Sequence, residues 1–175
     1  ENPRLEITTL ADIPAGTGLG SSSSFTTALL YALCAHRRQL INPKELAEMA
    51  CTIELDRLGE PIGKQDQYVA THGGICCFTF NKDDSVIVEP LAIDKDVLDD
   101  LEDNLLLFFT GFTRSAGSIL QDQKTRTEEN DQEILHNLHY IKELGLRSRE
   151  ALGNGEMGQF GKLMHEHWEF KKKRF

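Results

Sequence analysis

The sequence lacks the features that define several large classes of protein. Its 175 residues contain no apolar run long enough to span a bilayer and no recognisable signal peptide, so we expect no membrane partner. Asp and Glu outnumber Lys and Arg by 28 to 19, and the net charge of −9 argues against nucleic-acid binding, which needs positive charge to meet phosphates. A small anionic ligand stays compatible with this charge, because backbone amides and a few basic side chains can hold one.

Metal and redox spacings are also missing. The four cysteines form no CxxC pair and the six histidines show no zinc-like spacing with them, so we expect free thiols in a reducing, cytoplasmic environment. Disorder is excluded by composition, because 39% of the residues are hydrophobic and can form a core.

The order of the expected elements indicates an α+β fold. "NPKE" at 42–45 predicts a helix start with an Asn cap, a proline in the first turn and a glutamate at capping-box spacing, and that helix should end near Gly59. Further helices are expected from about residues 25, 68, 118 and 156. Strand-like patterns cover 5–12, 75–80, 85–91 and 105–111, the last as a continuous apolar run typical of a buried strand.

The most informative motif is "PAGTGLGSSSSF" at 14–25. Three glycines at alternate positions lead into four serines and a helix, whereas a simple turn needs only one or two glycines. Such a loop lets several backbone N–H groups point at one anion, and the helix N-terminus adds partial positive charge. The pattern therefore favours phosphate binding.

Two other phosphate-binding loops do not fit this spacing. A P-loop needs Lys and Ser/Thr after its last glycine, but Gly20 is followed by Ser21. A dinucleotide-binding GxGxxG loop would need glycine at position 21 and an acidic residue after a second strand, and the sequence offers neither. A dinucleotide-dependent oxidoreductase is therefore disfavoured.

A second group of polar residues lies in "IELDRLGEPIGKQDQYVATHGG" at 53–74. Phosphoryl transfer needs a cation that bridges phosphate oxygens and a group that orients or deprotonates the attacking hydroxyl. Glu54 on a helix and Asp66 in the following loop could supply these functions. From the residues alone, a solvated Glu54 and a helix-capping Asp66 are the simpler interpretations.

Together these motifs resemble those of the GHMP kinases, the family of galactokinase, homoserine kinase, mevalonate kinase and phosphomevalonate kinase. The pattern P-x-x-x-G-L-G-S-S-S is similar to their phosphate-binding loop. "GEPIGKQDQYVATHGG", "LLLFFTGFTRSAGSIL" and "HEHWEFKKK" resemble the branch of D-glycero-D-manno-heptose 7-phosphate kinases and related sugar kinases. The resemblance covers nearly the whole chain.

This resemblance implies a site for ATP and Mg²⁺. Ser22 and Glu54 would bind Mg²⁺, and Asp66 would face the sugar hydroxyl as a base or orienting group. Thr113, Arg114 and Lys64 become candidates for contact with a substrate or ATP phosphate. The triphosphate would be held by the loop residues Pro14, Gly16, Thr17, Gly18, Leu19, Gly20, Ser21, Ser22 and Ser23.

The activity that the resemblance implies is transfer of the γ-phosphate of ATP to the anomeric hydroxyl of D-glycero-D-manno-heptose 7-phosphate, toward a nucleotide-activated heptose. Two alternatives stay open: another GHMP sugar kinase, of the fucose or hexose type, and a non-catalytic ATP- or sugar-binding module. Retention of both Glu54 and Asp66 favours an enzyme, since a sensor needs neither.

The implied architecture is the GHMP-kinase fold, with a mixed sheet backed by helices and the start of a ferredoxin-like C-terminal domain. Residues 1–104 should form the ATP-binding N-terminal domain, incomplete at its start, and residues 105–175 a truncated C-terminal domain. An early strand with a basic residue and a C-terminal glycine-rich motif, usual in the family, are not found, so we expect a central fragment. Unpaired sheet edges would favour association, for example as a homodimer.

Overall fold

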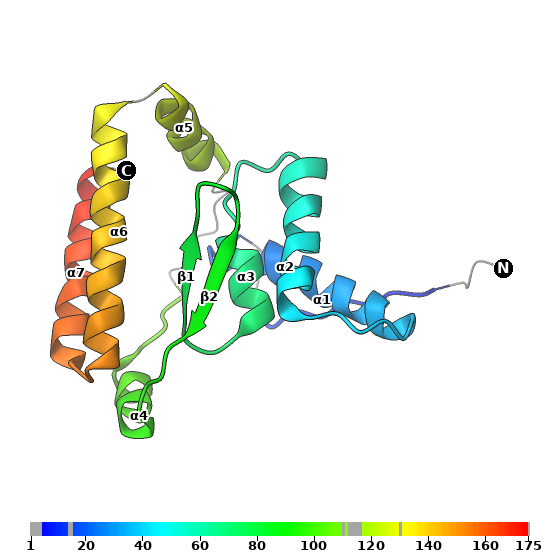
Figure 1. The fold of residues 1–175 in the computed structure, drawn as a ribbon, viewed down its shortest axis with the longest axis horizontal. Helices are drawn as coiled ribbons and strands as arrows, with labels where there is room; N and C mark the ends of the chain where they lie inside the picture. The colour runs from blue at the N-terminus through cyan, green and yellow to red at the C-terminus, as the bar shows by residue number, and fades with distance from the viewer. Residues whose placement is uncertain (1–4, 14–15, 110, 112–116, 130, 175) are drawn as a thin grey trace.

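The computed structural model of the chain describes residues 5–13, 16–109, 111, 117–129 and 131–174. Helices α1 to α3 lie on one side of a β-hairpin, and the long helix pair α6 and α7 lies on the other (Figure 1). Within the described residues, no helix combines the length and apolar character needed to cross a membrane. The elements in chain order are α1 (Ser21–His36), α2 (Pro43–Cys51), the π-helical segment η1 (Thr52–Arg57), α3 (Gln65–His72), β1 (Cys76–Phe80), β2 (Val86–Pro90), α4 (Lys95–Asn104), α5 (Gly117–Glu128), α6 (Gln132–Gly153) and α7 (Met157–Arg174).

Local capping signals fix the start of α2. The Asn42 side chain accepts a hydrogen bond from the backbone N–H of Glu45 at 2.9 Å, and the Glu45 carboxylate accepts one from the N–H of Asn42 at 3.4 Å. Pro43 occupies the first turn, where backbone N–H groups have no partner within the helix, so the missing N–H of proline removes no helical hydrogen bond. The predicted helix start is therefore confirmed. The helix continues through η1 and ends before Gly59, which has a φ of 70°.

The first core fixes α3 against α2 and the hairpin. The two strands predicted at 75–80 and 85–91 form as β1 and β2, which pair antiparallel with Cys76 opposite Pro90 and Phe80 opposite Val86. The ring of Tyr68 meets that of Phe78 edge-on, with centroids 6.3 Å apart. This packing holds α3 in place, and with it the residues at its N-terminus. The core consists of buried Ala47, Cys51, Tyr68 and Val86 together with Leu55, Phe78 and Val88.

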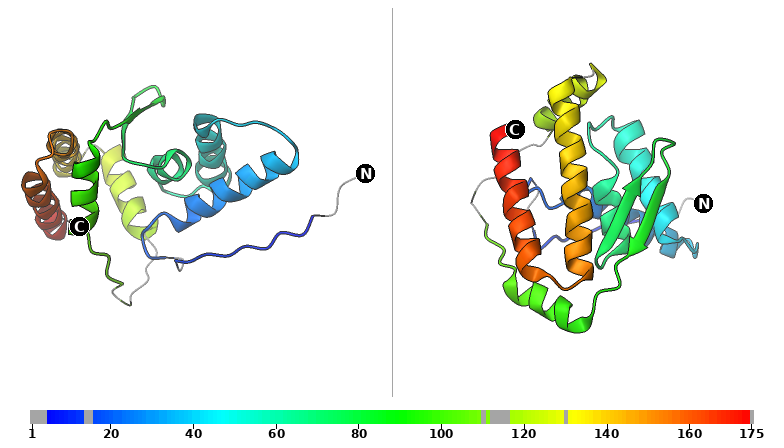
Figure 2. Two further views of the ribbon diagram at one scale, coloured as in Figure 1. Left: turned by 90° about the horizontal axis from the view of Figure 1, so that it is seen from below. Right: turned by 60° about the vertical axis from the view of Figure 1, so that its left-hand side comes forward.

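The second core lies between α6 and α7, which run side by side in both views of Figure 2. Arg147 donates to both carboxylate oxygens of Glu166, at 3.2 and 3.3 Å, and so links the two helices. Asp131 caps α6 by accepting a hydrogen bond from the N–H of Glu133 at 2.9 Å. The sequence predicts one helix from about Ser118 to Gly145, but the structure has two, α5 and α6, and α6 continues past Gly145 to Gly153. The core comprises Leu144, Ala151 and Leu163 with Tyr140 and Phe160.

Two predicted strands do not form in the described part of the chain. Residues 5–13 are extended along α1 (Figure 2) but pair with no described strand, and residues 7–13 line an apolar groove of about 520 Å³. Residues 105–109 are also unpaired in the described part of the chain, and Leu106, Leu107 and Phe108 are 78, 80 and 76% exposed rather than buried. A strand needs a neighbour that bonds its backbone and covers its side chains.

The sheet is consequently smaller than predicted. Among the described residues it has two antiparallel strands, β1 and β2, and is not a mixed sheet. The α+β class is confirmed, because helices and this hairpin coexist in one chain. The ferredoxin-like character of residues 105–175 stays a prediction.

Candidate active site

The glycine-rich loop enters α1 through three left-handed residues. Gly16, Gly18 and Gly20 have φ values of 77, 78 and 67°, a region that glycine adopts without a steric penalty. Gly20 is the N-cap of α1 and has no side chain to cap it, and no acidic residue lies in the first turn. The first amides of the helix therefore stay available to an anion. Pro14 lies outside the described residues.

The carboxylate of Glu54 lies against the first turns of α1. Its Oε1 accepts hydrogen bonds from Ser22 Oγ at 2.5 Å and Thr26 Oγ1 at 3.2 Å. Its Oε2 accepts from Ser23 Oγ at 2.8 Å and from Gln67 Nε2. Glu54 is only 1% exposed, so the interpretation of a solvated helix acid is wrong. It sits in η1, and π-helical segments occur frequently at functional sites.

Glu54 is ionised at neutral pH. Burial raises the pKa of Glu54, but the hydrogen bonds from the serines, Gln67 and Thr26 together outweigh it and hold the pKa below its ordinary value of 4.5. None of the ion pairs found among the described residues involves Glu54. Buried charges in proteins are usually paired or bound to metals. The carboxylate and the Ser22 hydroxyl are also oxygen donors, which suit Mg²⁺.

The described residues do not form a complete metal cage. No group of three or more His, Cys, Asp or Glu is arranged for a metal in the part of the chain that the structure describes. Mg²⁺ commonly binds through one or two carboxylates and completes its coordination with waters and substrate phosphates. Ser22 and Glu54 therefore fit a cation that arrives with a nucleotide.

Asp66 lies beside the N-terminus of α1. A Cβ built on Gly20 would lie 3.3 Å from Asp66 Cγ and 3.4 Å from its Oδ2, so the carboxylate is in close contact with the glycine-rich loop. Asp66 is exposed and can reach a ligand. It is not the N-cap of α3, because that helix begins at Gln65 with Lys64 as its N-cap.

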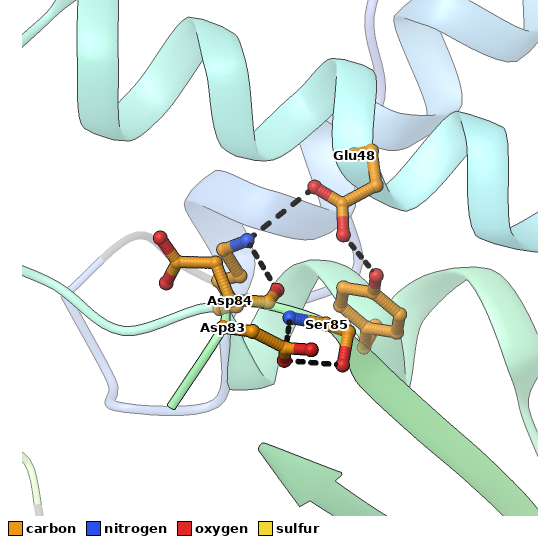
Figure 3. A network of polar contacts seen from close by, with 6 residues as sticks. Glu48, Asp83, Asp84 and Ser85 are labelled. Carbon is orange, nitrogen blue, oxygen red and sulfur yellow. Dashed lines mark hydrogen bonds and ion pairs between the residues drawn. The ribbon is translucent and has the colours of Figure 1, made fainter. Parts of the chain in front are cut away.

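Lys64 takes part in a separate polar network (Figure 3). Its Nζ lies 3.5 Å from Glu48 Oε2 and donates to the backbone oxygen of Asp84 at 3.1 Å. Tyr68 donates its hydroxyl to the other oxygen of Glu48. These contacts join α2, α3 and the turn of the hairpin, and they account for Lys64 without a ligand. Thr113 and Arg114 lie outside the described residues.

Two partners of Glu54, Thr26 and Gln67, are not among the residues that the sequence analysis selects. Thr26 follows Ser22 by four residues, so both lie on one face of α1, and helical spacing could have identified it. Gln67 has no such signal, because its contact with Glu54 joins α3 to η1 through the tertiary structure.

The chain is similar to known proteins. Residues 2–74 match the family model of the GHMP kinases N terminal domain. The chain is 34% identical, over 94% of its length, to D-glycero-alpha-D-manno-heptose 7-phosphate kinase of Campylobacter jejuni, and covers 48% of that protein. It is 31% identical, again over 94% of its length, to the bifunctional fucokinase/GDP-fucose pyrophosphorylase of Arabidopsis thaliana, of which it covers 16%.

The chain is also similar in fold to a solved structure. The crystal structure of a D-glycero-D-manno-heptose 1-phosphate kinase from Bacteroides thetaiotaomicron has a TM-score of 0.74 to this chain at 33% identity, covering 93% of this chain and 46% of that one. The chain thus spans less than half the length of the relatives compared. The described loop residues, Glu54 and Asp66 all fall within the matched residues 2–74. Over residues 2–74, the chain contains a GHMP kinases N terminal domain.

Proposed function

We propose that the protein is an ATP-dependent sugar kinase. The observation that carries this proposal is the convergence of three elements at the N-terminus of α1. The left-handed glycine loop, the buried Glu54 carboxylate on Ser22, and Asp66 against Gly20 meet there. A phosphate-binding loop alone would serve a binding module, but two carboxylates beside it suit phosphoryl transfer.

Each group has a separate role in the proposed reaction. The amides from Gly16 to Ser22 and the N-terminus of α1 bind the triphosphate of ATP. Ser22 and Glu54 would hold Mg²⁺, which when bound would neutralise charge on the phosphate oxygens. Asp66 orients the sugar hydroxyl and accepts its proton. Catalysis then rests on positioning and charge neutralisation.

The proposed acceptor is D-glycero-D-manno-heptose 7-phosphate, phosphorylated at its anomeric hydroxyl. The likeness to a heptose 7-phosphate kinase supports this choice, and the likeness to a heptose 1-phosphate kinase supports a heptose phosphate in general. The comparable likeness to a fucokinase supports a fucose or hexose acceptor as the alternative. Thr113 and Arg114 are proposed to contact the phosphate of the acceptor, whereas the contacts of Lys64 leave that residue out of the proposal.

The test is ADP release from Mg-ATP with heptose 7-phosphate, fucose, mannose, galactose and mevalonate as acceptors. Release with heptose 7-phosphate alone, lost in Asp66→Asn, would support the acceptor and the role of Asp66. Release with another sugar would support kinase activity with a different acceptor. Tight ATP binding without release for any acceptor would contradict the proposal and favour a non-catalytic module.

A further inference from the structure

Gln67 is fully buried beside the candidate cation site, one residue after Asp66. Its Nε2 donates to Glu54 Oε2, but its own Oε1 is buried and has no hydrogen-bond partner among the described residues. A buried polar atom without a partner destabilises a fold by about 1–3 kcal/mol. An apolar residue of similar size would avoid this loss, so fold stability alone does not account for a glutamine here.

The orientation of the amide follows from its hydrogen bond. Both carboxylate oxygens of Glu54 accept hydrogen bonds, and the NH₂ group, whose Nε2 donates to Oε2, is the only donor on the Gln67 side chain. The reversed amide would place oxygen against oxygen. Gln67 therefore keeps its donor on Glu54 even though this leaves Oε1 unpartnered.

The two oxygens of Glu54 are held in different ways. Oε2 is bound by two buried groups, the hydroxyl of Ser23 at 2% exposure and the fully buried amide of Gln67. Oε1 is bound by hydroxyls of the exposed Ser22 and the half-buried Thr26. Oε2 is thus anchored in the interior, and Oε1 lies on the side of the accessible residues.

We propose that Gln67 is a positioning residue for the cation site, which holds the Glu54 carboxylate so that Oε1, next to the Ser22 hydroxyl, is presented to the cation. This inference rests on the proposed function, because it assumes that Ser22 and Glu54 bind the cation of Mg-ATP. Groups that hold a metal ligand in place typically contribute about 10- to 100-fold to metal affinity.

The test is the Mn²⁺ affinity of Gln67→Met, measured by electron paramagnetic resonance in the presence of the ATP analogue AMP-PNP. We expect Mn²⁺ to bind at least about tenfold more weakly. AMP-PNP binding in EDTA should stay unchanged. The melting temperature should change little, because the substitution removes the unpartnered Oε1 along with the hydrogen bond. If Gln67 only stabilised the fold, Gln67→Met would lower the melting temperature and leave the Mn²⁺ affinity unchanged.

Tyr68→Phe is the matched control. Tyr68 follows Gln67 on α3, is equally buried, and also donates to a carboxylate, but that carboxylate is Glu48 in the network of Figure 3. Loss of the Tyr68 hydroxyl should lower the melting temperature and leave the Mn²⁺ affinity unchanged.

The outcomes separate the two proposals. Unchanged Mn²⁺ affinity in Gln67→Met, or an equal loss in Tyr68→Phe, would overturn the inference. If Gln67→Met does not fold, Gln67→Asn, one methylene too short to reach Glu54, should show the same weakening, and normal affinity in that variant would overturn the inference. Failure of the unmodified protein to bind Mn²⁺ with AMP-PNP would instead overturn the proposed function.

Discussion

Replacement of Gly20 by alanine should impair turnover by displacing Asp66. The φ of Gly20 is 67°, and a left-handed alanine costs about 1–2 kcal/mol. The new Cβ would also lie 3.3 Å from Asp66 Cγ, which is tighter than ordinary contact, so the carboxylate must move by a few tenths of an ångström. A misplacement of about 1 Å can lower a rate by about 10²-fold. We therefore expect turnover to fall by about tenfold.

Gly59→Ala separates backbone strain from the displacement of Asp66. Gly59 has a similar φ of 70°, nothing lies within 4 Å of its added Cβ, and it takes no part in the candidate site. Both variants should melt roughly 2–8 °C lower, because 1 kcal/mol corresponds to about 2–4 °C for a chain of this length.

The assay combines thermal unfolding with ADP release at saturating substrates. Similar melting temperatures, with reduced turnover in Gly20→Ala alone, would support the contact between the loop and Asp66. Equal turnover in the two variants would refute the reasoning that Gly20 provides room for this carboxylate.

Three further predictions concern the loop and the carboxylates. Asp66→Asn should lower turnover by about 10²-fold or more with ATP affinity unchanged by calorimetry, and normal turnover would remove its proposed role. Gly18→Val should weaken ATP binding because a side chain would crowd the phosphate. An unchanged Kd for ATP would count against this loop as the phosphate-binding site. Since the folded pKa of Glu54 lies below 4.5, its ionised form stabilises the fold above about pH 4.5 and this stability is lost as pH falls through the folded pKa. Acid unfolding monitored by circular dichroism should therefore be less pH-dependent in Glu54→Gln, and identical profiles would contradict this.

Features encoded within a few residues could be predicted from the sequence. The capping box of Asn42 and Glu45 and the hairpin of β1 and β2 form as expected, because their partners are close in the chain. The left-handed glycines of the loop at 16–20 are likewise local, since only glycine adopts that backbone easily.

Features that depend on distant partners could not be predicted. Segments 5–12 and 105–111 have strand-like patterns, but a pattern does not supply the neighbouring strand that pairing needs. The contact of Asp66 with Gly20 and that of Gln67 with Glu54 depend on how α3 packs against α1 and η1. The sequence points to Glu54 and Asp66 only through the family resemblance, and it gives no indication of Gln67.

The most direct test of the central claim is a crystal structure of the protein with Mg²⁺ and AMP-PNP. We expect the triphosphate on the backbone amides of residues 16–22, the cation on Ser22 Oγ and the Glu54 carboxylate, and Asp66 facing the γ-phosphate. Nucleotide bound elsewhere, or at the loop with a cation that contacts neither Ser22 nor Glu54, would contradict the account.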